Sequence, residues 1–324
     1  MGRGSGGIGG VSALLVAAAM SAHPAFAQHS KHESAWEPVA ELIYAVRAAA
    51  VATDGNRIFV FGGSTDGNRK TAHTQIYDPW TGAWSLGDEV PKPLDWSSVV
   101  YVGRRFHLLG GVTDEVAATD EHWIYDPFED EWWTGPDMPS AAAGAAAVHV
   151  GGQILVVGGI DGPRTYSDRV RVLDLESGAW SERRRGPAAN INWQGVVFDG
   201  ALFVVGGSGP GRVTSDVLHR YDPATDRWSV HAAVPVATEG YGGTMVNGRY
   251  CVLGGRVTPA SGSFGSPSDR AYCYLPESDV WWEAPRLPTP MQEVGAIAVE
   301  GALYAIGGRP TWDRSTAAVY RLRF

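Results

Sequence analysis

The sequence predicts an all-β protein, a six-bladed β-propeller built of four-stranded antiparallel blades. The main observation behind this prediction is a short apolar run that ends in a glycine pair and occurs six times. A fixed repeat period of this size indicates a series of equivalent supersecondary units. The first glycine of each pair falls at Gly62, Gly110, Gly158, Gly206, Gly254 and Gly307, which gives a period of 48 residues four times and then 53.

A tryptophan stands 26 residues before the first glycine of every pair. An aromatic residue precedes most of these tryptophans by seven positions, as Tyr77 precedes Trp84. Glycine pair, aromatic residue and tryptophan, over about fifty residues, form the pattern of the kelch repeat. The chain therefore resembles the bacterial exported type of kelch-repeat β-propeller over about residues 33–324. That resemblance implies the fold and says little about function, because propellers carry many unrelated activities. The six tryptophans are Trp36, Trp84, Trp132, Trp180, Trp228 and Trp281.

Alternating apolar patterns and turn residues divide each repeat into four strands, which we call a to d in chain order. In the second repeat we expect strands a, b and c at residues 97–101, 106–109 and 122–125, and strand d around Trp132. Residues 140–147 of the third repeat are rich in alanine and favour a helix by propensity. The repeat register instead places them in strand a, where the crowded propeller axis requires small residues, so we predict a strand.

Closure of the ring is predicted from the two ends of the sequence. The sixth repeat has a strand c at residues 318–322 and no strand d after it, whereas Trp36 precedes the first whole repeat in strand-d register. We therefore expect the N-terminal strand around Trp36 to complete the last blade. Such closure removes two exposed sheet edges.

Residues 1–27 have the pattern of a secretory signal peptide. Arg3 supplies the positive charge, residues 11–20 are apolar, and Ala25-Phe26-Ala27 resembles a cleavage site. Ten apolar residues are too few to span a bilayer. We expect residues 28–34 to form a flexible tail and residues 35–324 a single propeller that is periplasmic or secreted, without a membrane span. The alternative is a disordered leader that stays attached.

The two cysteines fall in one repeat, with Cys251 on the predicted strand b and Cys273 on strand c. Export permits a disulfide, but the separation and direction of the side chains decide whether it can form. A disulfide and a pair of buried thiols both remain open.

The b–c loops and d–a connections emerge at one face of the ring, which we call the b–c/d–a face. Its loops vary in length and sequence, and variable loops on a rigid scaffold commonly carry binding residues. Arginine forks suit carboxylate or phosphate ligands, although they could instead pair with neighbouring loop acids. Trp312 is a candidate stacking platform or a loop anchor. The candidate loop arginines are Arg69, Arg164, Arg212, Arg256 and Arg309.

A second group of polar residues stands at the predicted start of strand a, facing the mouth of the central channel. Glu239, Glu293 and Asp95 are candidate general acids or bases, and Arg47, Asn192 and Trp96 are candidate ligand-binding residues. The alternative is a solvated, salt-bridged channel mouth. Four aspartates recur five residues before the aromatic position, and we expect their side chains to tie each loop to strand c. They are Asp120, Asp168, Asp216 and Asp269.

Composition excludes several function classes. The formal net charge of −9 and the lack of a basic stripe argue against nucleic acid. No zinc-type cysteine and histidine spacing, phosphate loop or dinucleotide motif occurs, so we expect no metal and no cofactor. The chain should be a monomer or a simple homodimer.

Two hypotheses for the function remain. The first is a binding protein that recognises a protein or a glycan, or another small anionic ligand, on the b–c/d–a face. The second is a carbohydrate-active enzyme on the same face that resembles the periplasmic sialic-acid mutarotases, which are also kelch propellers. An enzyme requires acids and arginines that converge on a concave pocket, whereas a protein-binding face is broad with exposed aromatic residues.

Overall fold

The computed structural model describes residues 1–2, 36–163, 165–191, 194–258 and 265–324. Contacts divide the chain into two units, residues 1–33 and residues 34–324, and the account below concerns the second unit. The predicted signal peptide and flexible tail lie outside the described residues. Within the part that is described, no helix is long and apolar enough to cross a membrane.

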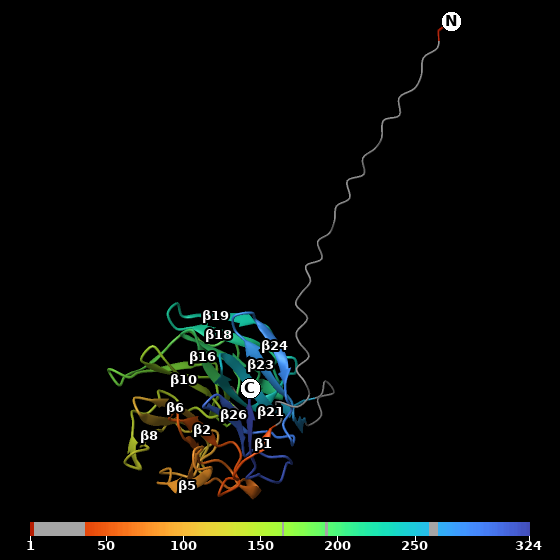
Figure 1. The fold of residues 1–324 in the computed structure, drawn as a ribbon. Helices are drawn as coiled ribbons and strands as arrows, with labels where there is room; N and C mark the ends of the chain where they lie inside the picture. The colour runs from red at the N-terminus through yellow and green to blue at the C-terminus, as the bar shows by residue number, and fades with distance from the viewer. Residues whose placement is uncertain (3–35, 164, 192–193, 259–264) are drawn as a thin grey trace. The chain divides into compact units, whose positions relative to one another are not determined.

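The described residues form six antiparallel blades, arranged around a central axis in Figure 1, which confirms the predicted fold class. Blade 1 contains β2 (Ala50–Thr53), β3 (Ile58–Phe61), β4 (Thr74–Asp78) and β5 (Ala83–Gly87); blade 2 contains β6 (Ser98–Val102), β7 (Arg105–Leu109), β8 (His122–Asp126) and β9 (Glu131–Thr134). Blade 3 contains β10 (Ala146–Val150), β11 (Gln153–Val157), β14 (Val170–Asp174) and β15 (Trp180–Glu182); blade 4 contains β16 (Gly195–Phe198), β17 (Ala201–Val205), β18 (Leu218–Asp222) and β19 (Arg227–His231).

Blades 5 and 6 complete the ring. Blade 5 contains β20 (Glu239–Val246), β21 (Arg249–Val257), β23 (Ala271–Leu275) and β24 (Val280–Ala284), and the short β22 (Ser266–Pro267) also pairs with β21. Blade 6 contains β25 (Gly295–Val299), β26 (Ala302–Ile306), β27 (Val319–Arg323) and β1 (Glu37–Pro38). The b–c loops carry a small hairpin of β12 (Ile160–Gly162) and β13 (Thr165–Tyr166) and two 3-10 turns, η1 (Asp66–Asn68) and η2 (Pro210–Arg212).

Strand β1 closes the ring, as predicted. It pairs antiparallel with β27, with Glu37 opposite Arg321, and the two side chains form an ion pair at 2.8 Å. The preceding residue, Trp36, is buried, and its indole Nε1 donates a hydrogen bond to the carbonyl of Pro285 at 2.9 Å. Pro285 lies just beyond the last strand of blade 5. The N-terminal segment therefore contacts both blade 6 and the end of blade 5.

The Trp36 contact repeats around the ring. All six repeat tryptophans stand on a d strand or just before it. In five of them the indole donates to a backbone carbonyl that follows the d strand of the preceding blade, whereas Nε1 of Trp228 has no hydrogen-bond partner among the described residues. These bonds tie neighbouring blades together at their outer strands, which explains why tryptophan recurs with the repeat. They run from Trp84 to Ala40 (2.8 Å), Trp132 to Asp88 (3.1 Å), Trp180 to Pro136 (2.8 Å), Trp281 to Ala232 (2.7 Å) and Trp36 to Pro285 (2.9 Å).

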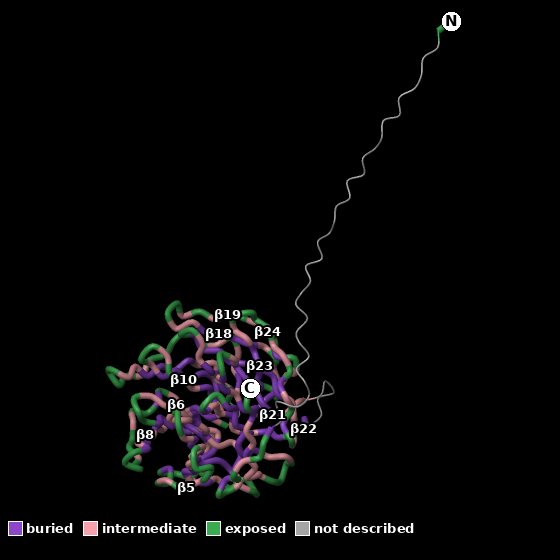
Figure 2. The backbone as a smooth tube through the Cα atoms, viewed as in Figure 1, coloured by how far each residue is buried: buried purple, intermediate pink, exposed green. Residues whose placement is uncertain are grey.

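The core lies between neighbouring blades. Between blades 1 and 2, for example, Phe59 and Phe61 of β3 pack against Phe106 of β7, with 4.4 Å between the ring centroids of Phe59 and Phe106. Figure 2 shows the same distribution around the axis, with buried residues along the inner strands and exposed residues on the outer turns. The apolar b strands before the glycine pairs are therefore buried on both faces.

The strand predicted for residues 140–147 is correct in type of secondary structure, but the observed strand covers fewer of these residues. No helix forms there, but β10 begins only at Ala146, and Ala143 makes a single bridge to Ile160. The reason is Gly144, whose φ of 62° turns the backbone between the bridge and the strand. Only the last two residues of the alanine-rich segment belong to the regular strand.

The side-chain hydrogen bond that links each b–c loop to strand c comes from a serine or threonine and not from the predicted aspartate. The side chain of Asp168 instead forms an ion pair with Arg185, and that of Asp269 forms one with Arg286. The serine or threonine one position earlier accepts a hydrogen bond from the amide two residues later, a local turn that short hydroxyl side chains favour. These residues are Thr71, Thr119, Ser167, Ser215, Ser268 and Thr316.

Cys251 of β21 and Cys273 of β23 stand directly opposite each other in the sheet and form a disulfide. Both residues are fully buried. The bond therefore links strands b and c of blade 5 inside the core.

Two buried histidines meet in blade 2. His107 Nδ1 lies 2.9 Å from His122 Nε2, and His122 Nδ1 lies 3.2 Å from the carbonyl oxygen of Pro136. Because a carbonyl only accepts, His122 donates to Pro136 and accepts from His107 while both rings are neutral. Burial lowers the pKa of His107 to about 4, with a further lowering by His122, Arg105 and His149. Burial also lowers the pKa of His122.

We expect this pair to make stability fall in mild acid. The neutral rings stabilise the fold fully above the unfolded histidine pKa near 6.5, and this contribution is lost as the pH falls toward 4. For His107 alone, the free energy of unfolding should drop by about 2 kcal/mol between pH 7 and pH 5. Urea denaturation at the two pH values measures this, and His107→Leu should reduce the dependence while His73→Ala leaves it unchanged. An equal pH dependence in His107→Leu and the parent would contradict the assignment.

Candidate functional site

The start of each a strand and the beginning of the following b–c loop lie at the same end of the blade. Backbone bridges join Arg47 to Ser64, Asp95 to Val112 and Gln292 to Arg309, and β20 pairs Glu239 with Arg256. The residues predicted at the channel mouth and those predicted on the loops are therefore neighbours on the b–c/d–a face. Two candidates, Arg164 and Asn192, lie outside the described residues.

An arc of backbone hydrogen bonds links the described a-strand starts of neighbouring blades at this mouth. The amide of Ala48 donates to the carbonyl of Glu293, that of Trp96 to Ala48, that of Gly144 to Trp96, and that of Glu293 to Gly240. All five residues have a left-handed conformation, with φ between 52° and 62°, which is unfavourable for residues other than glycine. The bonds between blades stabilise this conformation. Trp96 and Glu293 therefore have a structural role at the mouth whatever their side chains bind.

Three arginines meet two of the predicted catalytic carboxylates at the mouth. Glu293 accepts from Arg47 and, at 2.9 Å, from Arg309, and Glu239 forms an ion pair with Arg256. With Trp312, these residues form what we call the arginine cluster. Both of its carboxylates are already engaged by guanidinium groups.

Trp312 is the aromatic part of the arginine cluster. The guanidinium carbon of Arg309 lies 4.7 Å from the centroid of the Trp312 ring, and that of Arg256 lies 5.5 Å from it. Arg309 also donates to the Trp312 carbonyl at 3.4 Å. About half of the Trp312 residue is exposed, at 48%. The ring thus combines a cation–π contact with a solvent-facing surface, which suits a stacking platform.

The arginines also repel one another. Burial lowers the pKa of Arg256, and the nearby positive charges of Arg212 and Arg309 lower it further. Burial likewise lowers the pKa of Arg309, with a further lowering by Arg47. An arginine guanidinium group remains protonated at neutral pH. The cluster holds three guanidinium groups and two carboxylates, so a positive charge is left that an anionic ligand can neutralise.

Asp95 lies apart from the exposed part of the arginine cluster. It is buried, accepts from the hydroxyl of Ser64 at 2.5 Å, and has a pKa that burial raises. Its contacts suit a structural acceptor between the b–c loop and the next a strand. Arg69 and Arg212 are exposed on the loops that carry η1 and η2.

Comparison with known proteins identifies the family. The description "KLHDC2/KLHL20/DRC7 Kelch-repeats domain" matches the chain over residues 38–184 and 98–308. The chain belongs to the kelch-repeat family. It is also 36% identical over 56 residues to Kelch-like protein 35 of Mus musculus, a match that covers 17% of this chain and 10% of that protein. The kelch resemblance seen in the sequence is thus confirmed, and kelch propellers are generally protein-interaction scaffolds.

One contact at the channel mouth of this kelch propeller was missed in the sequence. The side chain of Asn68 in η1 accepts from Arg47 at 2.5 Å and so helps to position that arginine beside Glu293. Asn68 stands next to Arg69, which we did select, and the only available signal was its place in the same b–c loop. Its role depends on the fold of the loop and cannot be predicted from residue type.

Proposed function

We propose that this kelch propeller is a recognition protein that binds an anionic group of a protein or glycan partner on the b–c/d–a face. The observation that supports this is the arginine cluster, in which Arg256 and Arg309 stand against the half-exposed ring of Trp312. Guanidinium groups bind carboxylate or phosphate through paired, charge-assisted hydrogen bonds. An aromatic platform beside them offers apolar contact to the rest of the partner.

The geometry favours binding over catalysis. A general acid or base must be able to exchange a proton with the substrate, but the oxygens of Glu239 and Glu293 face arginines. Asp95, the third candidate, is buried against Ser64. The alternative function, a carbohydrate-active enzyme similar to sialic-acid mutarotases, therefore has less support from the arrangement of these residues.

The proposal predicts that anionic probes bind through the arginine cluster. We would titrate N-acetylneuraminate, glucuronate and an aspartate- and glutamate-rich peptide against the protein by calorimetry. Hydrogen bonds to charged groups contribute about 1.5–3 kcal/mol, so Arg256→Ala and Arg309→Ala should each weaken binding by about tenfold or more. The control is Arg104→Ala, because Arg104 lies over Phe128 at the opposite face, 4.6 Å from its ring. Binding that is equal in both cluster variants and the parent would rule out the cluster as the site.

We further propose that the protein is exported. Two observations support this, the signal-peptide pattern of residues 1–27 and the disulfide between Cys251 and Cys273, since structural disulfides persist in oxidising compartments. The mature protein purified from its native host should begin at Gln28. N-terminal sequencing and fractionation test this expectation, and a chain that keeps residues 1–27 in the cytosol would contradict it.

A further inference from the structure

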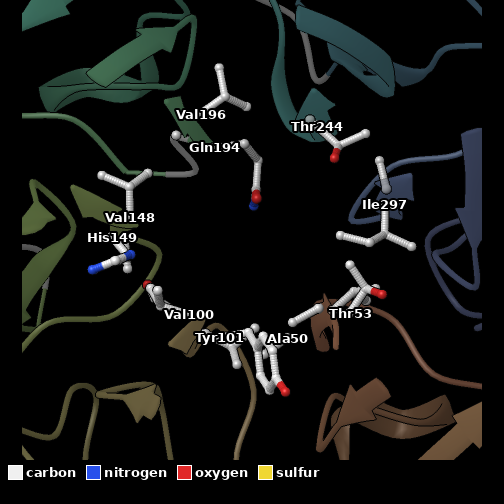
Figure 3. Close-up of a pocket in the computed structure, with 18 of the residues that line it drawn as sticks. Ala50, Thr53, Val100, Tyr101, Val148, His149, Gln194, Val196, Thr244 and Ile297 are labelled. Atoms are coloured by element: carbon white, nitrogen blue, oxygen red, sulfur yellow. The ribbon is translucent and has the colours of Figure 1, made fainter. Parts of the chain in front are cut away.

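The centre of the propeller contains a chamber that is separate from the arginine cluster. It has a volume of about 510 Å³ and is lined by the a strands of all six blades, and Figure 3 looks into it. This volume lies within the usual range of small-molecule sites. The chamber extends to Thr53, Tyr101 and His149, which stand at the ends of their a strands next to the a–b turns. It therefore reaches toward the face opposite the arginine cluster.

Gln194 stands between this chamber and the channel mouth. It lines the chamber and also a smaller cavity of about 60 Å³ that is bounded by Trp96 and Glu293. Its side-chain amide points toward the centre of the opening in Figure 3. The buried hydroxyl of Tyr250 donates to the Gln194 carbonyl at 2.5 Å, and the Gln194 amide N–H donates to the hydroxyl of Tyr241 at 3.3 Å. The backbone is thus held in place while the side chain remains exposed.

A second polar group in the wall is unused. Ser97 lines both cavities, and its buried hydroxyl has no hydrogen-bond partner among the described residues. Buried hydroxyl groups in folded proteins are almost always satisfied. Because the Ser97 hydroxyl is buried, a molecule in the chamber does not reach it directly. The Gln194 amide, which points into the opening in Figure 3, is the polar group that a bound molecule can satisfy.

The wall also defines the chemistry of the occupant. None of the described residues that line the chamber is Asp, Glu, Lys or Arg. Burial of a charged ligand without a counter-charge is strongly unfavourable. The wall also offers apolar side chains, among them Val99, Met245 and Ile297. We propose that the chamber binds a small neutral molecule that combines hydroxyl groups with an apolar face, such as a monosaccharide or a cyclic polyol.

The test uses ligand-observed NMR on the protein of residues 28–324 with glucose, galactose, N-acetylglucosamine and myo-inositol as neutral probes. Glucuronate and glucosamine serve as charged counterparts. At least one neutral probe should bind the parent protein saturably. In Arg256→Ala, which removes an arginine of the anion site, it should bind at least tenfold more tightly than its charged counterpart. Gln194→Ala should weaken binding several-fold. Ala147→Trp, which fills the chamber, should abolish it. Met245→Trp is a second filled variant, and thermal melting shows which variants fold.

Arg256→Ala separates this site from the arginine cluster and should leave the binding of neutral probes unchanged. The proposal is overturned if no neutral probe binds the parent protein. It is also overturned if a folded variant with a filled chamber binds as tightly as the parent, or if Arg256→Ala abolishes binding. None of these results depends on whether the b–c/d–a face binds an anion, so the two sites are tested independently.

Discussion

Replacement of Trp36 by alanine is expected to lower the free energy of unfolding by about 3–5 kcal/mol, the usual cost of truncating a buried aromatic residue. Trp36 is buried in the cluster that joins blades 5 and 6, where it packs with Leu287 and Leu322. The substitution also removes the indole hydrogen bond to Pro285 and loosens the entry of β1 into blade 6. We therefore expect β1 to separate from blade 6 at a lower denaturant concentration than in the parent protein.

Chemical denaturation of Trp36→Ala and of two matched variants measures this effect. Trp80→Ala is the control, because Trp80 is 92% exposed and its loss should change stability by no more than about 0.5 kcal/mol. Trp36→Phe keeps most of the apolar contact and loses the hydrogen bond, so it should cost about 1 kcal/mol from that bond, with some lost packing in addition. A Trp36→Ala variant as stable as Trp80→Ala would show that closure by β1 does not stabilise the propeller.

Removal of the disulfide in blade 5 is expected to cost about 3 kcal/mol. Cys251 and Cys273 are 22 residues apart, and a cross-link over a loop of this length reduces the conformational freedom of the unfolded chain. The double variant Cys251→Ala/Cys273→Ala removes the bond without placing new polar groups in the core. The effect should reside mainly in the unfolded state, because the two residues are paired neighbours in the sheet in any case.

Thermal and urea unfolding, with and without a reductant, provide the measurement. The reductant should destabilise the parent protein by about the same amount as the double substitution, and should not affect the double variant. Folding of the double variant with an unchanged midpoint would contradict a stabilising role for the bond. If the reductant also destabilised the double variant, the loss of stability that it causes in the parent protein could not be assigned to the Cys251–Cys273 bond.

Only part of the candidate site could be predicted from the sequence. Arg256 and Arg309 were selected because they stand in the variable b–c loops, and the structure brings them together against Trp312. A salt-bridged channel mouth was one of the two alternatives considered for Glu239 and Glu293, and both residues do form ion pairs. Which arginine each would meet could not be predicted, since it depends on which blades are neighbours and on how each loop turns. Asp95 shows the same limit, because its burial against Ser64 follows from the packing of a loop on the next blade.

By itself, the sequence determined the number of blades, the order of their strands and the closure by the segment around Trp36. These features follow from local and repeated constraints, since each repeat needs a buried b strand, a turn with glycine and a tryptophan at the blade boundary. The tertiary structure alone decided which polar residues meet. The arginine cluster, the histidine pair of blade 2 and the chamber around Gln194 each combine residues from different strands or blades. Their contacts depend on strand register within a blade or on the packing of one blade against the next, neither of which the spacing along the chain specifies.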